Sequence, residues 1–308
     1  MSGTITTGNY PKLLWPGVNQ IFGDVHSNYV GEHSVIFKKS MSDKRFEEDQ
    51  HIVNMGLATE LGEGDAVSYD SARQGFTKRY THVNYAKGFV ITRIMLDDVQ
   101  YGMDLATRHA RMIANSLNQT KEIVAANVLN NGFDSTYTGG DAKELLATDH
   151  PLYAGGGTQK NELTTAADLS EASLEQALID IGSSVDDAGL KIALRANKLI
   201  VPIDLQFTAE RILHSTKRVD TADNDLNAIS SMSMLPGNYA VNHYLTDADA
   251  WFILVDGCDG DGLRHFQRKA YELTMDTDFN TDNLRCKATE RYSFGWSDWR
   301  AIFGSPGA

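Results

Sequence analysis

The sequence has little of several features that mark large classes of protein. Only two cysteines, Cys258 and Cys286, occur in 308 residues, which excludes a disulfide-stapled framework and a cysteine-rich zinc module. No stretch approaches the ~18 consecutive apolar residues of a membrane-spanning helix. The first residues hold neither a basic segment nor an apolar one, so we expect no signal peptide and a soluble product made in a cytosol.

The chain also has fewer basic than acidic residues. The chain carries 28 Lys and Arg against 41 Asp and Glu, a formal net charge of −13. Proteins that grip nucleic-acid phosphates present basic surfaces, so this balance argues against such a role and against a polybasic membrane anchor. Charged residues at 22% and hydrophobic ones at 42% are ordinary for a globular chain, whose length allows one large domain or two modest ones.

The N-terminal part is predicted to extend from the body of the protein. Residues 1–41 follow no helical period, yet they carry large apolar side chains such as Trp15 and Phe22, which indicates an extended arm that packs on another surface. Residues 42–54 are predicted to form a short helix, because Ser42 can cap it and acids gather in its first turns.

Residues 55–95 are predicted to form a projecting β-hairpin. Its return limb, residues 76–85, is rich in β-branched and aromatic side chains with interleaved charges, and residues 68–75 are polar and prone to turns. The apolar content is too low for a segment buried on both faces, so we expect the hairpin to project.

The strongest single element is a helix predicted over residues 97–130. Apolar residues recur there at helical spacings without proline, Asp97 and Asp98 stand at its start, and Gly132 follows as a stop. Such a helix is about 50 Å long and suggests a structural spine. The rest mixes a helix at 168–188 with buried strands, without βαβ alternation, so the predicted class is α+β.

No set of residues predicts catalysis, a metal or a cofactor. The glycine runs at 139–140 and 155–157 lack the strand–helix context of a phosphate loop, and residues 256–262 lack the ligand spacing of a calcium loop. Asp24 and His26 resemble one ligand run of a metallophosphatase, but its partners are missing.

The order of the elements resembles the major capsid proteins of tailed bacteriophages, which have the HK97-type fold, with the nearest likeness to Mu-like major head subunits. The segments that carry the resemblance are Leu146–Tyr153, Asn197–Pro202, Trp251–Leu254, Asp278–Arg285 and Phe294–Arg300. It implies an N-terminal arm, an E-loop hairpin, a peripheral (P) domain with the spine helix, and an axial (A) domain. Their expected bounds are 1–41 for the arm, 55–95 for the E-loop, 96–144 with 266–308 for the P-domain, and 145–265 for the A-domain.

The same resemblance implies a function and partners. The chain would self-assemble into hexamers and pentamers of an icosahedral shell around double-stranded DNA, and would be found in the virion. Because the spine helix begins near residue 97, there is no room for a built-in scaffolding domain, so a separate scaffolding protein is implied. A portal protein and a decoration protein are the further candidate partners. The expected contacts between subunits involve Trp15, Phe22, Glu60, Glu63, Lys78 and Arg79.

Some family members cross-link a hairpin lysine to a neighbouring subunit. Lys78 and Lys87 lie in the corresponding region, but nothing in the local sequence predicts that bond, and we do not expect it. Two alternatives stay open at this point: an encapsulin-like compartment with the same fold, and a soluble α+β hydrolase that uses Asp24 and His26. The acidic balance leads us to expect a neutral or acidic lining toward enclosed DNA.

Overall fold

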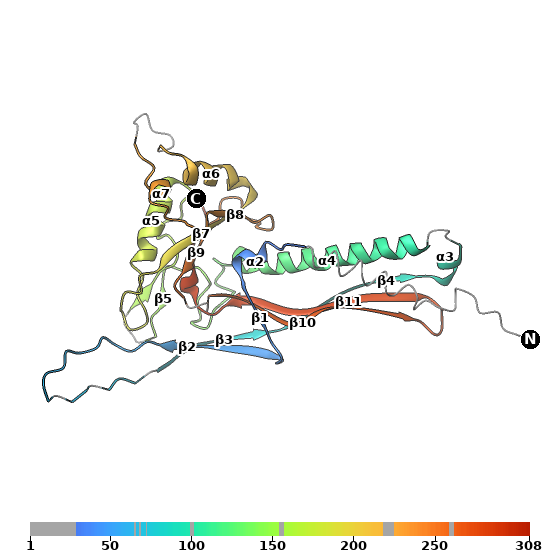
Figure 1. Cartoon of the computed structure of the whole chain (residues 1–308), viewed down its shortest axis with the longest axis horizontal. Coiled ribbons are helices and arrows are strands. Elements are labelled where there is room, and N and C mark those ends of the chain that lie inside the picture. The colour runs from blue at the N-terminus through green and yellow to red at the C-terminus, as the bar shows by residue number, and fades with distance from the viewer. Residues whose placement is uncertain are drawn as a thin grey trace, which may run out of the picture.

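The computed structural model describes residues 29–64, 66–67, 69–71, 73–98, 102–153, 157–217, 225–258 and 262–308. Within them the chain forms two lobes and one thin hairpin (Figure 1). A long helix over a sheet makes the long lobe, a smaller sheet with short helices makes the compact lobe, and the hairpin extends in the opposite direction from the long lobe. Trp15, Phe22, Asp24 and His26 lie outside the described residues.

The sheet of the long lobe has the strand order β1-β10-β11-β4. Its strands are β1 (Lys38–Met41), β10 (Leu263–Thr277), β11 (Leu284–Trp296) and β4 (Val83–Ile91). β1 runs parallel to β10, and the other neighbours are antiparallel. The four strands come from three separate parts of the chain, so segments near both ends of the sequence are needed to complete this sheet.

A long helix, α4 (Gly102–Asn130), lies along one face of this sheet (Figure 1). Its buried residues Ala110, Ile113 and Leu117 pack on Leu284 and Ala288 of β11. The spine helix is thus confirmed, but its predicted start is not. Asp97 and Asp98 end a separate short helix, α3 (Arg93–Asp98), in which the Thr92 hydroxyl accepts a hydrogen bond from the Met95 amide.

The short helix predicted over residues 42–54 is wrong. Residues 46–53 form strand β2 (Phe46–Val53), antiparallel to β3 (Arg73–Thr81). The acids that suggested a helix start instead face cations across the strand pair, where Glu48 lies opposite Arg79 and Asp49 opposite Lys78. Cross-strand pairing between distant segments outweighs the local helix signal, because strand preference depends on the partner rather than on the segment itself.

The projecting hairpin is confirmed, with different limbs from those predicted. β2 is its outgoing limb, residues 54–72 form its tip, and β3 is the return limb. After a break at the buried residue His82, the chain continues as β4, which leaves the hairpin and joins the sheet of the long lobe. The strands within residues 55–95 therefore belong to two different sheets, β3 to the hairpin and β4 to the long lobe. The alternation of polar and apolar residues in the sequence cannot show which partner each strand has.

The compact lobe contains the second sheet, ordered β12-β9-β7-β8. Its strands are β12 (Ile302–Ser305), β9 (Trp251–Asp256), β7 (Arg195–Val201) and β8 (Tyr239–Val241). The helices α5 (Glu171–Gly182), α6 (Gln206–His214) and α7 (Ala228–Ser231) pack against it. The helix predicted at 168–188 is thus confirmed as the shorter α5, whose first turn is capped by Ser170.

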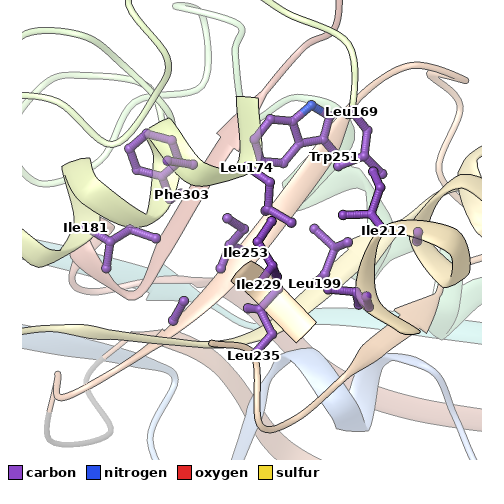
Figure 2. Close-up of a cluster of buried hydrophobic side chains, with 14 of the residues drawn as sticks. Leu169, Leu174, Ile181, Leu199, Ile212, Ile229, Leu235, Trp251, Ile253 and Phe303 are labelled. Atoms are coloured by element: carbon purple, nitrogen blue, oxygen red, sulfur yellow. The ribbon is translucent and has the colours of Figure 1, made fainter. Parts of the chain in front are cut away.

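The core of the compact lobe is a continuous apolar cluster around β9 and β7 (Figure 2). Trp251, Leu199 and Ile253 are fully buried there, and the Trp251 indole donates its N–H to the carbonyl of Ala167 at 3.0 Å. A second cluster joins the lobes, with Leu129 of α4 in the same core as Phe252 of β9. Shared burial of this kind makes the two lobes one body.

The remaining elements are short. They are α2 (His33–Ile36), β5 (His150–Pro151), β6 (Thr158–Gln159), and two 3₁₀ turns, η3 (Ile203–Leu205) and η4 (Trp299–Ala301). The α2 segment bridges the lobes, because Glu32 bonds to the amide of His243 at 2.9 Å while the His33 amide donates to Glu122 of α4 at 2.9 Å.

Candidate functional site

The tip of the hairpin, residues 54–72, is acidic and partly apolar, and its described residues (54–64, 66–67 and 69–71) are exposed. Its sequence holds four acids and no Lys or Arg, and Glu60 and Glu63 are both exposed. The side chains of Leu57 and Tyr69 are 79% and 95% exposed. The other large apolar side chains of the tip, Met55, Leu61 and Val67, are also more than half exposed. A concentration of exposed apolar side chains of this kind marks a contact surface.

The two limbs of the tip are tied together at its base. The amide of Gly56 donates to Asp70 Oδ2 at 2.9 Å, and the amide of Ser71 donates to Asp70 Oδ1 at 2.8 Å. These two backbone hydrogen bonds lower the pKa of Asp70, with that from Gly56 contributing most. The two limbs of the hairpin are therefore held next to each other at the base of the tip.

Lys78 and Arg79, which the sequence suggested as subunit contacts, lie on β3 and have partners within the chain. Lys78 Nζ donates to the Thr138 carbonyl at 2.5 Å and lies 4.6 Å from the centre of the Trp296 ring. Burial lowers the pKa of this ammonium. The Arg79 guanidinium lies 3.6 Å over the Phe46 ring. Lys78 thus holds the hairpin against residues 138 and 296, and Arg79 joins the two limbs of the hairpin to each other. A contact of either cation with a neighbouring subunit remains a prediction.

A second set of contacts fastens the root of the hairpin to the end of β11. Ser297 Oγ donates to Asp49 Oδ2 at 2.6 Å, and the Tyr80 hydroxyl lies 2.6 Å from the same serine oxygen. The Tyr80 ring lies over Gly295, where an added Cβ would stand 2.8 Å from a ring carbon. Glycine is needed here because it allows this close approach. No motif in the sequence pointed to this group, because its members are about 250 residues apart at most and meet only in the fold.

A third contact joins the hairpin to the compact lobe. His51 Nδ1 on β2 lies 3.0 Å from Asp187 Oδ2, and Arg300 Nη2 lies 3.0 Å from Asp187 Oδ1. The close contact with the Asp187 carboxylate raises the pKa of His51. Burial would raise the pKa of Asp187, but the hydrogen bond from His51 and the charge of Arg300 outweigh it and lower that pKa to about 2.

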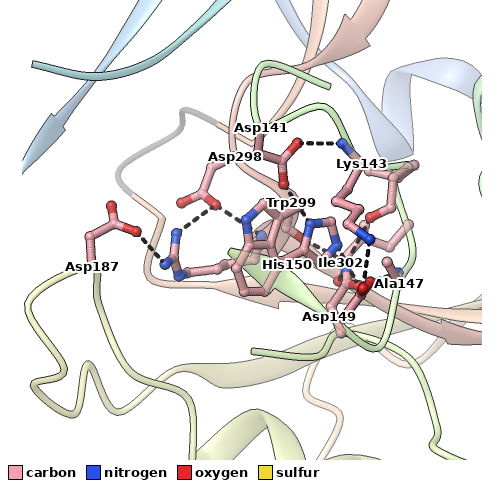
Figure 3. A network of polar contacts seen from close by, with 12 residues as sticks. Asp141, Lys143, Ala147, Asp149, His150, Asp187, Asp298, Trp299 and Ile302 are labelled. Carbon is pink, nitrogen blue, oxygen red and sulfur yellow. Dashed lines mark hydrogen bonds and ion pairs between the residues drawn. The ribbon is translucent and has the colours of Figure 1, made fainter. Parts of the chain in front are cut away.

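Two of the segments that carried the sequence resemblance meet at the lobe junction (Figure 3). The His150 ring stacks on Trp299 with centroids 4.1 Å apart, and its Nδ1 lies 2.6 Å from Asp141 Oδ2. Asn161 accepts at Oδ1 from the Ala147 amide, and its Nδ2 donates to three backbone carbonyls. These residues fix the C-terminal segment against residues 141–161.

Charged side chains are also buried between α4 and the sheet. Lys121 of α4 bonds to Glu290 of β11, with 9% and 0% of their side chains exposed, and Gln267 Nε2 donates to the same carboxylate at 3.2 Å. His265 stacks on Phe294 at 4.3 Å, and burial lowers its pKa to about 3.

The opposite face of this sheet carries cations of β11 together with acids of β10, since Arg285 lies opposite Asp276 and Thr289 lies opposite Glu272 in the antiparallel register. On β11 the residues Leu284, Cys286 and Ala288 pack toward α4, so the alternate residues point to the other face. Those alternate residues are Arg285, Lys287, Thr289 and Arg291. We call the surface formed by these four residues of β11 the bare sheet face.

Charge is unevenly divided along the chain. Residues 145–262 hold 18 Asp and Glu against 7 Lys and Arg, a net −11, and the tip adds −4. The remaining residues carry a net +2, so the acidity of the chain resides in the compact lobe and the tip.

The described residues offer little for catalysis. Among them, no group of three or more His, Cys, Asp and Glu side chains could hold a metal ion. Burial raises the pKa of the Cys286 thiol to about 11, which keeps it unreactive. In the same part of the chain, no helix has the length and apolar character needed to span a membrane.

Comparison with solved structures shows which fold this is. The capsid of a native GTA particle matches with a TM-score of 0.58 and 13% identity, covering 91% of this chain and 92% of that one. A virus-like particle from Pyrococcus furiosus matches with a TM-score of 0.53 and 11% identity, over 94% and 97% of the two chains. Microbacterium phage Oxtober96 gives 0.53 and 10%, over 91% and 92%. The chain has the HK97-type capsid fold, as expected.

Comparison at the level of sequence gives the family. No curated protein matches the chain. The model of a family described as phage capsid protein matches residues 75–304, which are most of the chain. A structural role in the capsid follows, and the hydrolase alternative is set aside. The likeness to Mu-like head subunits stays a prediction. On these grounds, this chain belongs to the phage capsid protein family and is a major capsid protein that forms the shell of the virion.

Proposed function

We propose that the parts of the chain have the roles that the family resemblance implies. The hairpin of β2, β3 and the tip acts as the E-loop, so the E-loop begins near residue 46 instead of 55. The long lobe, which holds α4 and the sheet of β1, β10, β11 and β4, acts as the P-domain, and the compact lobe, which holds the sheet of β12, β9, β7 and β8, acts as the A-domain. The expected bound of 266–308 for the P-domain therefore needs a correction, because β12 (Ile302–Ser305) pairs with β9 in the compact lobe. Residues 1–41 act as the N-terminal arm.

The tip docks on the bare sheet face of a neighbouring subunit. The observation that carries this proposal is charge complementarity, because the charged side chains of the tip are all acids whereas the bare sheet face presents Lys287 and Arg291 beside Arg285, which is paired with Asp278 within the chain. The exposed apolar side chains of the tip add a hydrophobic contribution, since they remain in water in a single subunit. Opposite potentials of this kind favour the correct partner and suppress wrong ones.

Repetition of this contact builds the shell. The tip and the bare sheet face are different surfaces, so each contact is heterologous, and a heterologous contact closes into a ring when its rotation allows. Hexamers and pentamers are the expected rings. They enclose double-stranded DNA, with a separate scaffolding protein during assembly, a portal protein at one vertex, and a decoration protein as a further partner.

The test is a shortened hairpin. Residues 57–69 are replaced by a short glycine linker, because the bond between Gly56 and Asp70 shows that the limbs are adjacent there. We expect a folded subunit with unchanged circular dichroism that forms no shells in negative-stain images when produced with its scaffold. Normal shells from this variant would disprove the docking role.

A charge exchange tests the partner surface. Glu63→Lys and Lys287→Glu each should reduce shell yield, and the two together should restore part of it if these surfaces meet. Lys191→Glu, on the compact lobe away from both surfaces, is the control and should assemble. Shells that hold cargo protein and no DNA would favour an encapsulin-like compartment.

A further inference from the structure

We propose that His51 is a pH-sensitive latch that fixes the hairpin against the compact lobe while its imidazole is protonated and releases it when the proton is lost. The effect of this latch on assembly rests on the proposed function, because the position of the hairpin matters for assembly only when the tip docks on a neighbouring subunit. The latch itself is a property of a single subunit.

The geometry makes the carboxylate of Asp187 dependent on His51. The Asp187 side chain is 3% exposed, and one of its oxygens, Oδ1, is held by Arg300 at 3.0 Å. The other oxygen, Oδ2, has no hydrogen-bond partner among the described residues apart from the ion pair with His51 Nδ1 at 3.0 Å. A neutral imidazole can still donate from Nδ1, but only the protonated ring supplies a positive charge, and a buried carboxylate is costly without a compensating cation, so the charge of protonated His51 stabilises this contact.

The surroundings of His51 carry an excess of negative charge. A cavity of about 210 Å³ at the hairpin root is lined by His51 together with Asp186, Asp187, Asp298 and Arg300. Three carboxylates thus line the cavity beside one guanidinium. Protonation of the His51 imidazole adds a second positive charge and reduces the excess of negative charge by one. The neighbouring groups complete the environment: Asn54 and the half-buried Cys258 line the same cavity, and Lys78 and Asp141 line the adjoining one.

Opening of the latch leaves the other root contacts in place, namely Ser297 with Asp49 and Tyr80, and Lys78 with Thr138. Those contacts bind the hairpin to the end of β11 and to residue 138, whereas His51 and Asn54 are its contacts with residues 186 and 187. Release of His51 therefore leaves the contact of Asn54 with Asp186 as the remaining hold on residues 186 and 187, so the hairpin is loosened against the compact lobe without being freed.

The direction of the pH effect follows from the raised pKa of His51. A base whose pKa is raised in the folded state adds stability that is complete below its unfolded value, about 6.5, and is lost as the pH rises through the folded value. The latch is closed at mildly acidic pH and opens on the alkaline side.

Hydrogen exchange of the purified full-length chain tests the latch. Protection factors, which divide out the pH dependence of intrinsic exchange, are measured for the amides of β2 and β3 at pH 6 and pH 9. We expect the wild-type factors to fall by about tenfold for each unit by which the folded pKa exceeds the unfolded one. His51→Gln should give low factors at both values, and His51→Lys, with its permanent charge, should give high factors at both.

Two controls keep the result specific. His214→Gln alters an exposed histidine that pairs with Glu210 on α6, and it should behave as wild type. The amides of β7 report the compact lobe and should keep their protection in every variant. An equal fall with pH in wild type and His51→Gln, or no fall in wild type, would overturn the latch. Either result leaves the tip-docking proposal to its own test, which is assembly of the shortened hairpin.

Discussion

Replacement of Lys121 by methionine should destabilise the long lobe by about 3–5 kcal/mol, the usual cost of removing one partner from a buried ion pair. Methionine keeps the length of the side chain but leaves the carboxylate of Glu290, which is fully buried, without its cation. The Gln267 amide remains as a donor at 3.2 Å, and it supplies no charge. The penalty therefore comes from the uncompensated carboxylate rather than from lost packing.

Hydrogen exchange in α4 and β11 measures this change locally, because slow amides there report opening of that lobe. A loss of 3–5 kcal/mol corresponds to a fall in protection of about two to four orders of magnitude. Lys143→Met is the matched control, since its pair with Asp149 is 35% and 54% exposed and solvent screens such surface pairs, so its loss should leave the protection almost unchanged.

A double variant tests whether the buried, unpaired carboxylate of Glu290 causes the loss of stability. Lys121→Met with Glu290→Gln removes both charges, so most of the lost protection should return, because an apolar or neutral replacement of a buried pair is often tolerated. If the single variant loses less than about 1 kcal/mol, or if the double variant is less protected than the single one, the reasoning from buried charge is refuted.

Three further outcomes are expected. Leu129→Ala, at a fully buried position of α4, should cost about 2–5 kcal/mol, seen as a lower midpoint in thermal unfolding. His265, with its pKa lowered to about 3, binds its proton more weakly when folded, so stability should fall by about 1.4 kcal/mol per pH unit from about 6.5 downward. His265→Phe should therefore move the midpoint of acid unfolding to lower pH, and an unchanged midpoint would contradict this. Gly295→Ala should push the Tyr80 ring aside and speed exchange in β3, whereas Gly182→Ala, with open space around its Cβ, should not.

The parts of the fold that were predictable are those with a strong local period. The long helix shows its apolar face within its own sequence, so its presence followed from spacing alone, and only its start was misplaced. The β2 segment was misjudged, because its acids favour a helix start locally and find their cations on β3 about 30 residues later. A segment with an ambiguous pattern takes its structure from its partner.

The candidate site divides in the same way. Exposure and acidity of the tip could be inferred from Glu60 and Glu63 with the adjacent Gly62 and Gly64, because such an acidic, glycine-containing segment has too little apolar surface to be buried. The latch formed by His51, Asp187 and Arg300 could not, since these residues are separated by more than 100 positions and carry no spacing that relates them.

The sequence by itself determined the α+β class, the spine helix, the projecting hairpin and the acidic balance, because each depends on local composition or on a period within one segment. Only the tertiary structure decided which strands pair, where the negative charge lies relative to the cations, and which histidine fastens the hairpin. Those properties depend on contacts between segments far apart in the chain, and such contacts are set by the packing of the whole molecule rather than by any one stretch of it.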